Sequence, residues 1–582
     1  MTKGERSAGA AQWARLLLFV YLFLMTVVYP LYMRDGYRQL GEAKYYVYRN
    51  ISLAVLALLA VVGVAALAGR HGKKGTAAHG TQQPGRAGAA AFWRALSLTD
   101  RFMLFYAASC LLSAAFAIDY RTAVFGLTGW RMGLLTNAFL IAFYFLYSRI
   151  SVYGQGGSVR TAGAALSLFT AGGTVVCAIA LLNRFSIVRF GGEYETSFLS
   201  TIGNINWYCG YLSVFLPVME LESMFDADRR RRALACAASF VGFASAATQG
   251  GASGFIVLGA LFLFAFAVGA ERGLWLLRAL RLVCLFGAAC QVVRLLRVLG
   301  GGSGYFNDYY YYNETAAGDS LTSGNGTLWL LLGGLAAYTA VRLYLRKRQT
   351  DGATRAHCAV ESGYKTKQSG VESGGKTKQC DADAALVLWT RRARLVVLTA
   401  LAVCAALYLG LLAFHTARPG VLPALDGRGA FTFDGDWGSA RGATWTAAAQ
   451  TYAALPPGRK LVGVGEDCFS AAAYGVSHVE EALRARFGGA MLRNAHNEWL
   501  TVLVNNGLFG LPAYAGIFIA AFVSFVRAGR REPLLYIAAG AVLAYTLHNM
   551  VSFRQVTSTP FIFLLLGMGE GMRRELERNG YR

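Results

Sequence analysis

The chain has 582 residues, of which 55% are hydrophobic and only 15% are charged, and this composition excludes an ordinary soluble protein. Its formal net charge is +24, from 56 Lys and Arg residues against 32 Asp and Glu residues. The basic residues lie largely in short loops between apolar runs, as in the cytoplasmic loops of membrane proteins. We therefore expect contact with anionic membrane lipids and no nucleic-acid partner.

Apolar runs of roughly 20 residues, the length that crosses a bilayer as a helix, recur along the sequence, and we count about fourteen of them. No small-residue cleavage site follows the first run, which is interpreted as a retained helix and not as a signal peptide. The sequence thus predicts an all-α, polytopic membrane protein. The predicted spans cover residues 12–31, 51–69, 101–117, 131–147, 161–182, 204–220, 232–249, 253–270, 273–298, 326–345, 394–415, 503–526, 533–551 and 560–572.

The loops between the predicted spans differ in charge. Loops 70–94, 221–232 and 346–393 are rich in Lys and Arg, whereas loop 299–325 contains neither. Because Lys and Arg concentrate in cytoplasmic loops, this pattern places both termini in the cytoplasm. We expect a multi-pass protein of the plasma membrane.

The N-terminal transmembrane helices are predicted over residues 1–415. The first long polar region, residues 346–393, lies within this part, before its last span. It contains a tandem repeat at 360–368 and 371–379, rich in Lys, Ser, Gly and Gln. A segment of this composition without apolar periodicity cannot bury a core. We predict a disordered cytoplasmic loop.

The second long polar region, residues 416–496, precedes the C-terminal transmembrane helices of residues 497–582. It is too long for a simple connector, and ordered loops of this length usually carry function. Its pattern predicts short helices near 439–452 and 477–487, separated by a glycine turn. We expect an extracytoplasmic catalytic loop that forms a helical cap on the membrane.

His496 lies on this loop just before a predicted span, with Arg493 close by and Arg441 upstream. An imidazole at a membrane surface can deprotonate a hydroxyl or donate a hydrogen bond to phosphate. Guanidinium groups bind phosphate oxygens bidentately and would stabilise a diphosphate leaving group without a metal or another cofactor. The alternatives are a polar tether for the histidine and contact with lipid headgroups for the arginines. We predict that His496 and Arg441 are catalytic and that Arg493 binds substrate.

Three further residues are predicted to bind substrate: Arg131 at an outward helix start, Asn497 beside the histidine, and Asn204 at the start of a span. The alternative for an asparagine at a helix start is N-capping, which is its usual role. Glu466 and Asp467 are an alternative base or cation site. Adjacent carboxylates on a glycine turn are more typical of a solvated turn, and no clustered Cys and His spacing indicates a metal.

Four short segments follow one another along the chain: Gly203-Asn-Ile-Asn-Trp207, Arg441-Gly-Ala-Thr-Trp445, Gly463-Val-Gly465 and Ala495-His-Asn-Glu-Trp-Leu500, with Gly507 and Gly510 after them. In spacing, order and outward placement they resemble the O-antigen ligase family, over roughly residues 100–572. The resemblance implies a membrane glycosyltransferase of the GT-C type, which transfers a glycan from undecaprenyl diphosphate to an acceptor hydroxyl on the outer face. His496 and Arg441 match the essential loop histidine and arginine of that family.

The chain departs from this family at one place. Members often carry a second arginine in a Ser-Arg-Gly-like motif at the outer end of a span, whereas the equivalent stretch here, residues 248–254, contains none. Binding of the diphosphate would then depend on another residue such as Arg131 or Arg493.

The acceptor is left open by the sequence. A lipid or protein acceptor would make the chain a ligase, and a second lipid-linked glycan would make it a polysaccharide polymerase. The alternative from another class is a transporter or flippase of lipid-linked glycans. We favour an enzyme because the sequence has no evident inverted repeat and few ionisable residues within its spans, both of which many transporters use.

Overall fold

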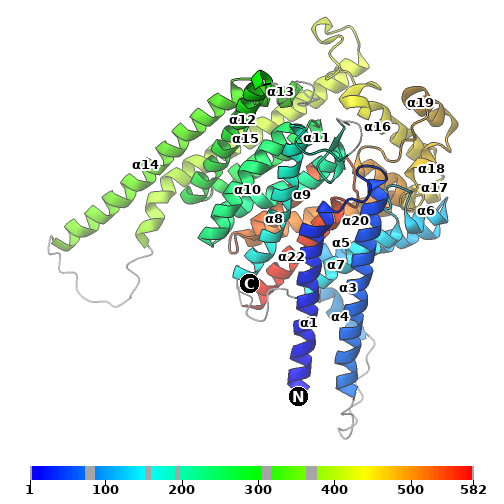
Figure 1. The fold of residues 1–582 in the computed structure, drawn as a ribbon, viewed down its shortest axis with the longest axis horizontal. Helices are drawn as coiled ribbons and strands as arrows, with labels where there is room; N and C mark the ends of the chain where they lie inside the picture. The colour runs from blue at the N-terminus through cyan, green and yellow to red at the C-terminus, as the bar shows by residue number, and fades with distance from the viewer. Residues whose placement is uncertain are drawn as a thin grey trace.

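The computed structural model describes residues 3–71, 86–150, 159–190, 197–303, 316–361 and 377–579, and within these ranges the chain is almost entirely helical (Figure 1). The predicted all-α class is confirmed. Within the same ranges the only strands are β1 (Phe198–Leu199) and β2 (Gly203–Asn204), which form a short antiparallel pair.

Eight helices in the described part of the chain are long and apolar enough to cross a membrane, which supports the prediction of a membrane protein. The first is formed by α1 (Lys3–Phe23), the π-helix η1 (Leu24–Val28) and α2 (Tyr29–Leu31). The others lie in α3 (Leu40–His71), α8 (Val159–Arg184), α11 (Ala252–Gly269), α12 (Gly273–Ser303), α14 (Gly326–Glu361), α15 (Thr377–Ala417) and α20 (Glu498–Gly529).

The remaining six predicted spans are also helical, but they are shorter or more polar. They are α5 (Leu98–Ala115), α7 (Leu134–Arg149), α9 (Ile205–Phe225), α10 (Arg229–Thr248), α21 (Leu535–His548) and α22 (Thr559–Arg578). Because α7 and α21 have only 16 and 14 residues, a total of about fourteen spans stays a prediction. Short helices α4 (Arg86–Ala95), α6 (Tyr120–Phe125) and α13 (Ala316–Ser323) lie between these elements.

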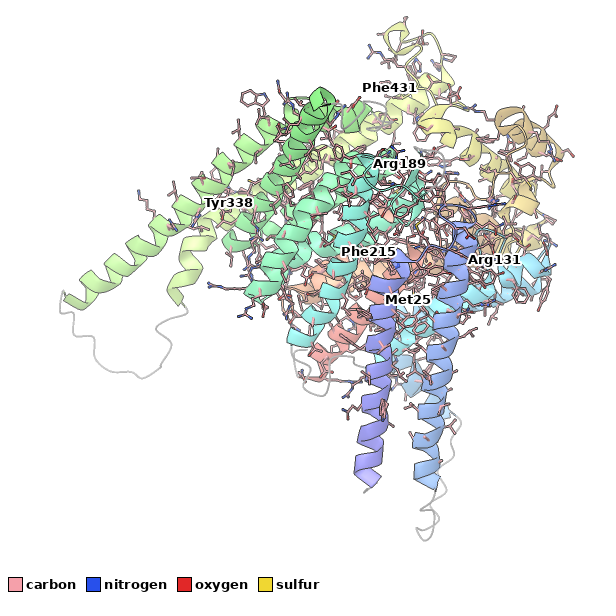
Figure 2. All side chains as sticks on the ribbon, in the orientation of Figure 1. Met25, Arg131, Arg189, Phe215, Tyr338 and Phe431 are labelled. Atoms are coloured by element: carbon pink, nitrogen blue, oxygen red, sulfur yellow. The ribbon has the colours of Figure 1, made fainter. Side chains whose placement is uncertain are left out.

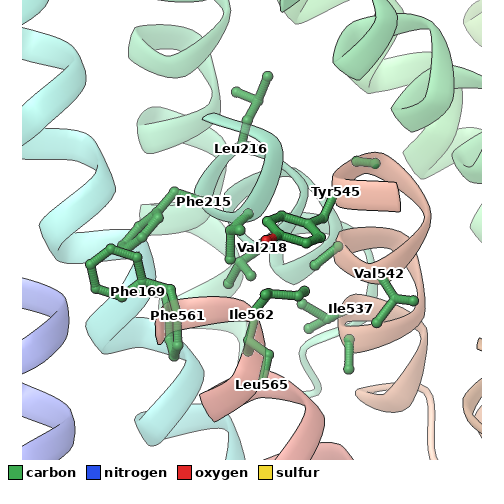
Figure 3. Close-up of a cluster of buried hydrophobic side chains, with 14 of the residues drawn as sticks. Phe169, Phe215, Leu216, Val218, Ile537, Val542, Tyr545, Phe561, Ile562 and Leu565 are labelled. Atoms are coloured by element: carbon green, nitrogen blue, oxygen red, sulfur yellow. The ribbon is translucent and has the colours of Figure 1, made fainter. Parts of the chain in front are cut away.

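The core of the molecule surrounds α9, whose residues 208–225 are all buried. Phe215 stacks on Tyr211 with ring centroids 3.9 Å apart and meets the edge of Phe561 on α22 at 4.8 Å. Figure 3 shows this cluster continuing into α21 through Val542 and Tyr545. In Figure 2 the side chains are densest around this centre, whereas Tyr338 lies on α14, which extends away from it.

The region predicted to be disordered, residues 346–393, is partly helical. The helix α14 continues to Glu361 and α15 begins at Thr377, so the prediction is wrong for 346–361 and 377–393. The rest of the tandem repeat, residues 362–376, lies outside the described residues. The error has a physical origin, because each polar flank extends a long apolar helix and continues hydrogen bonding that is already established.

The loop between α15 and α20 folds into the predicted short helices, which lie together at one end of the molecule, next to α6 (Figure 1). We call this unit the cap. A small core that includes Val464, Phe469 and Leu483 holds it together. Its helices are η3 (Pro423–Leu425), α16 (Trp437–Ala454), α17 (Pro457–Val462), α18 (Phe469–Ala473) and α19 (Ser477–Phe487).

The glycine turn of the cap is inserted into a break in α20. Gly507 has φ 67° and interrupts the helix, which leaves the carbonyl groups of Val504 and Asn505 available. The backbone N–H groups of Val464 and Gly465 donate to these carbonyls at 3.1 Å. A Cβ atom on Gly507 would lie 2.4 Å from the carbonyl oxygen of Leu461, so only glycine permits this approach.

Candidate functional site

Arg441 lies in α16 directly after three residues with left-handed backbone conformations, Gly438, Ser439 and Ala440, at φ values of 62°, 60° and 67°. Left-handed non-glycine residues are costly and concentrate at functional sites. This turn directs Arg441 out of the cap: its Nε donates to the carbonyl of Val551 at 2.8 Å, and its Nη1 donates to the carbonyl of Gly438 at 2.7 Å. Arg441 therefore joins the cap to the connection between α21 and α22.

His496 also has a left-handed backbone, with φ 49°. Its backbone N–H donates to Oδ1 of Asn494 at 2.9 Å, and its ring lies edge-on to Phe553 with centroids 5.0 Å apart. Burial of the ring, together with the positive charge of Arg441, lowers the pKa of His496 to about 4. Both predicted catalytic residues therefore contact the connection between α21 and α22, and the low pKa keeps the imidazole neutral near pH 7.

The other predicted cations occupy different positions. Both carboxylate oxygens of Glu42 on α3 accept hydrogen bonds from Arg131, at 2.9 and 3.0 Å. This pairing raises the pKa of Arg131. Arg131 is thus not the free cation that diphosphate binding would require. Arg493 is exposed and donates to the carbonyl of Thr128 at 3.2 Å, at the rim of the cap.

The two predicted asparagines are helix caps. Oδ1 of Asn204 accepts the backbone N–H of Asn206 at 2.9 Å and caps α9, and Oδ1 of Asn497 accepts that of Leu500 at 3.1 Å and caps α20. The capping alternative accounts for both side-chain oxygens. Each asparagine fixes the start of a helix beside the site.

Glu466 and Asp467 are buried, so the expectation of a solvated turn is wrong. Glu466 forms an ion pair with Arg554 at 2.5 Å, and Glu498 pairs with the same guanidinium at 3.0 Å. Nη1 of Arg554 also donates to the hydroxyl of Tyr106. Two buried carboxylates thus share one buried arginine, which connects the cap to the membrane-facing helices.

Asp467 gives the cap a pH-dependent stability. Burial raises its pKa from 3.8 to about 6, although its Oδ2 accepts the backbone N–H groups of Leu127 and Met132 at 2.7 and 3.1 Å. A carboxyl whose folded pKa exceeds its unfolded pKa stabilises the fold below the unfolded value, and this stabilisation is lost as pH rises through about 6. A difference of this size corresponds to about 3 kcal/mol.

We therefore predict that Asp467→Asn leaves the melting temperature in detergent unchanged at pH 4 and raises it at pH 7.5. Asparagine keeps an oxygen that can accept both N–H groups, but it never ionises. Thermal unfolding of both proteins at the two pH values measures the effect. A variant less stable than the wild type at pH 7.5 would contradict this account.

Sequence reasoning missed the segment 548–558, which connects α21 to α22. Six of its buried side-chain atoms have no hydrogen-bond partner within the protein, although buried polar groups are nearly always paired. Arg441 lies close enough for its charge to act on the imidazole of His548. The indication in the sequence was a short connection between two apolar runs in which polar residues predominate. The unpartnered atoms are Nε2 of His548, Oγ of Ser552, Nε2 and Oε1 of Gln555, Oγ1 of Thr557 and Oγ of Ser558.

Arg184 brings a positive charge to the stretch of residues 248–254, which itself contains no arginine. Its side chain is buried, with only 1% of the residue exposed. Its Nε and Nη2 donate to the carbonyl groups of Thr248 and Gln249 at 2.8 and 2.7 Å. A Cβ atom on Gly250 would lie 2.7 Å from Nη2 of Arg184 and 3.5 Å from Ile205, the first residue of α9, and Arg441 donates to Val551 in the α21–α22 connection. Two arginines from distant parts of the sequence therefore lie near the first turns of α9.

In the described part of the chain, no group of three or more His, Cys, Asp and Glu residues is placed to hold a metal ion. The site consists of a neutral imidazole, the half-buried Arg441, the buried Arg184 and a segment with unpartnered polar atoms, at one end of a helical bundle. In comparisons with known proteins, no family model and no curated protein matches the sequence.

Proposed function

We propose that the chain is a membrane glycosyltransferase that transfers a glycan from undecaprenyl diphosphate to an acceptor hydroxyl on the extracytoplasmic face. The observation that carries the proposal is that the neutral His496 imidazole and the Arg441 guanidinium, both half-buried, contact the same connection between α21 and α22. A proton acceptor beside a cation suits a reaction that deprotonates a hydroxyl and releases an anion. The resemblance to the O-antigen ligase family points to the same chemistry.

In the proposed reaction the acceptor oxygen attacks the anomeric carbon of the donor glycan. Its proton passes to Nδ1 or Nε2 of His496 as the bond between the anomeric carbon and the diphosphate oxygen breaks. The lipid diphosphate leaves with the bonding electron pair, and Arg441 stabilises its negative charge. A single displacement inverts the anomeric configuration.

The low pKa of His496 fits this sequence of events. In the free protein, burial and the charge of Arg441 lower the proton affinity of the ring. A bound diphosphate would bring negative charge to Arg441 and raise that affinity toward neutral pH. His496 would then become an effective base only when the donor is present.

The segment 548–558 suits the polar part of a glycan donor. Sugar hydroxyls both donate and accept hydrogen bonds, as the unpartnered groups of His548, Gln555 and Ser558 can do. Arg184 fixes the backbone of residues 248–249 through two hydrogen bonds. The proposal includes about fourteen spans in a GT-C-like arrangement, with both termini in the cytoplasm.

The test is transfer of a radiolabelled glycan from undecaprenyl diphosphate by the purified protein in detergent, with lipid, protein and glycan acceptors. Arg441→Gln is expected to lower the rate roughly 10- to 100-fold, because charge-assisted hydrogen bonds to the diphosphate are lost. The matched control is Arg484→Gln, on the exposed surface of α19 in the same cap, which should stay within twofold of the wild type.

The product separates the alternatives. A lengthened lipid-linked glycan identifies a polymerase, and a labelled lipid or protein anchor identifies a ligase. If no acceptor takes up label while liposomes containing the protein translocate the glycolipid, the enzyme proposal is wrong and the protein is a transporter.

A further inference from the structure

A strongly basic cavity is lined by the last residues of α20 and α22. Figure 1 shows the C-terminus, which follows α22, far from the cap helices α16 to α19. The volume of the cavity is about 1080 Å³. It lies between the C-terminal ends of α20 and α22, and α20 begins at the candidate site with Glu498. The lining consists of Ser524, Arg527, Ala528, Arg530, Arg531, Arg573, Arg574, Leu576, Glu577 and Arg578.

The lining contains six arginines and one acidic residue, a net charge of +5. The acidic residue, Glu577, forms an ion pair with Arg573. The partial negative charges at the C-terminal ends of two helices, about half an elementary charge each, are too small to offset this excess. The cavity is therefore an anion site by its electrostatics.

Two of the arginines form a rigid back wall. The carboxylate of Glu570, which is fully buried, forms ion pairs with Arg573 at 2.7 Å and with Arg574 at 3.1 Å. Arg574 also forms an ion pair with the buried Asp100. In contrast, Arg530 and Arg578 have side chains that are 69% and 66% exposed, with carboxylates no closer than 3.8 and 4.0 Å. The front of the cavity thus presents guanidinium groups to an incoming anion.

The outer face of α20 leads from apolar surface into this cavity. Ile519, Val523 and Arg527 follow one another at intervals of four residues and so lie on one stripe of the helix. Ile519 is 62% exposed and Val523 is 38% exposed, at the end of a helix apolar enough to span a membrane. An occupant with apolar chains beside Ile519 and Val523 and an anionic head beside Arg527 would contact the whole stripe.

We propose that this cavity binds the headgroup of an anionic phospholipid that carries two phosphates. Guanidinium groups bind phosphate oxygens bidentately, and basic pockets between helices at a membrane surface favour multiply charged headgroups. The apolar stripe favours a lipid over a free phosphate compound. This site is separate from the cap and does not depend on the proposed transfer reaction.

The experiment is a lipid titration of the purified full-length protein in neutral detergent, followed by native mass spectrometry. Tetraoleoyl cardiolipin is the diphosphate lipid, phosphatidylcholine is the zwitterionic lipid and inorganic diphosphate is the soluble anion. The variant Arg527→Gln/Arg531→Gln is expected to weaken cardiolipin binding by roughly tenfold or more, since each basic residue contributes to headgroup attraction.

The control Arg229→Gln/Arg230→Gln removes the same charge from exposed positions near Asp226, on the same side of the bundle. It should change binding less than twofold. Arg578→Gln on α22 is a milder second variant, and unchanged melting temperatures establish that the variants are folded. Equal losses in the control pair, equal binding of phosphatidylcholine, or binding of inorganic diphosphate as tightly as cardiolipin would each overturn the proposal.

Discussion

Replacing His496 with alanine is expected to lower the rate of glycan transfer by roughly 10²- to 10⁴-fold, the usual contribution of a positioned general base. The ring contacts Phe553 in the α21–α22 connection, to which Arg441 also donates a hydrogen bond. Initial rates at saturating donor measure the loss. His478→Ala, on the exposed face of α19, is the control and should retain the wild-type rate.

The pH profile separates a base from a residue that only supports the fold. For the wild type, kcat/KM should fall as pH drops through about 4, where His496 of the free protein gains a proton. The kcat profile should fall at a higher pH, because the bound diphosphate raises the proton affinity of the ring. Full activity of His496→Ala would show that the catalytic base is elsewhere, and the site assignment would be wrong.

Replacing Arg554 with methionine is expected to destabilise the protein by about 3–5 kcal/mol, because it leaves two buried carboxylates without a counter-charge. Glu466 and Glu498 are both fully buried and both pair with this one guanidinium. A large drop in melting temperature in detergent, or failure to purify a folded protein, is the expected result.

A second substitution tests whether charge is the cause. In Arg554→Met/Glu466→Gln one of the two orphaned carboxylates becomes neutral, so part of the lost stability should return. Arg484→Met removes an exposed ion pair with Glu480 and should cost less than about 1 kcal/mol. Equal melting temperatures for Arg554→Met and the wild type would contradict a structural role for the buried network.

The helices were predictable because apolar length is a local property of the sequence. Each of the fourteen predicted runs falls on a helix, and α19 has the predicted bounds 477–487. Whether a given helix crosses a membrane depends also on its contacts with other helices, which the local sequence does not show. α9 is buried on all sides by other helices, and α22 ends in charged residues that meet partners from α5 and from α22 itself.

The candidate site was predictable in part. Arg441 and His496 lie together, as their shared loop and the family resemblance led us to expect. Arg131 forms an ion pair with Glu42, which lies on a helix distant in the sequence, and no local pattern indicates such a pair. Arg554 was missed for the same reason, since its partners come from the cap and from the start of α20.

The insertion of the cap turn into the break of α20 determines how a substrate can arrive. Lifting the cap as a lid would separate the N–H groups of Val464 and Gly465 from the carbonyl of Asn505, and these groups have little water to replace their bonds. Hinged opening from above is therefore costly. For the proposed lipid-linked donor, entry sideways from the lipid between helices would cost less, so the spacing of the surrounding helices would act as the gate.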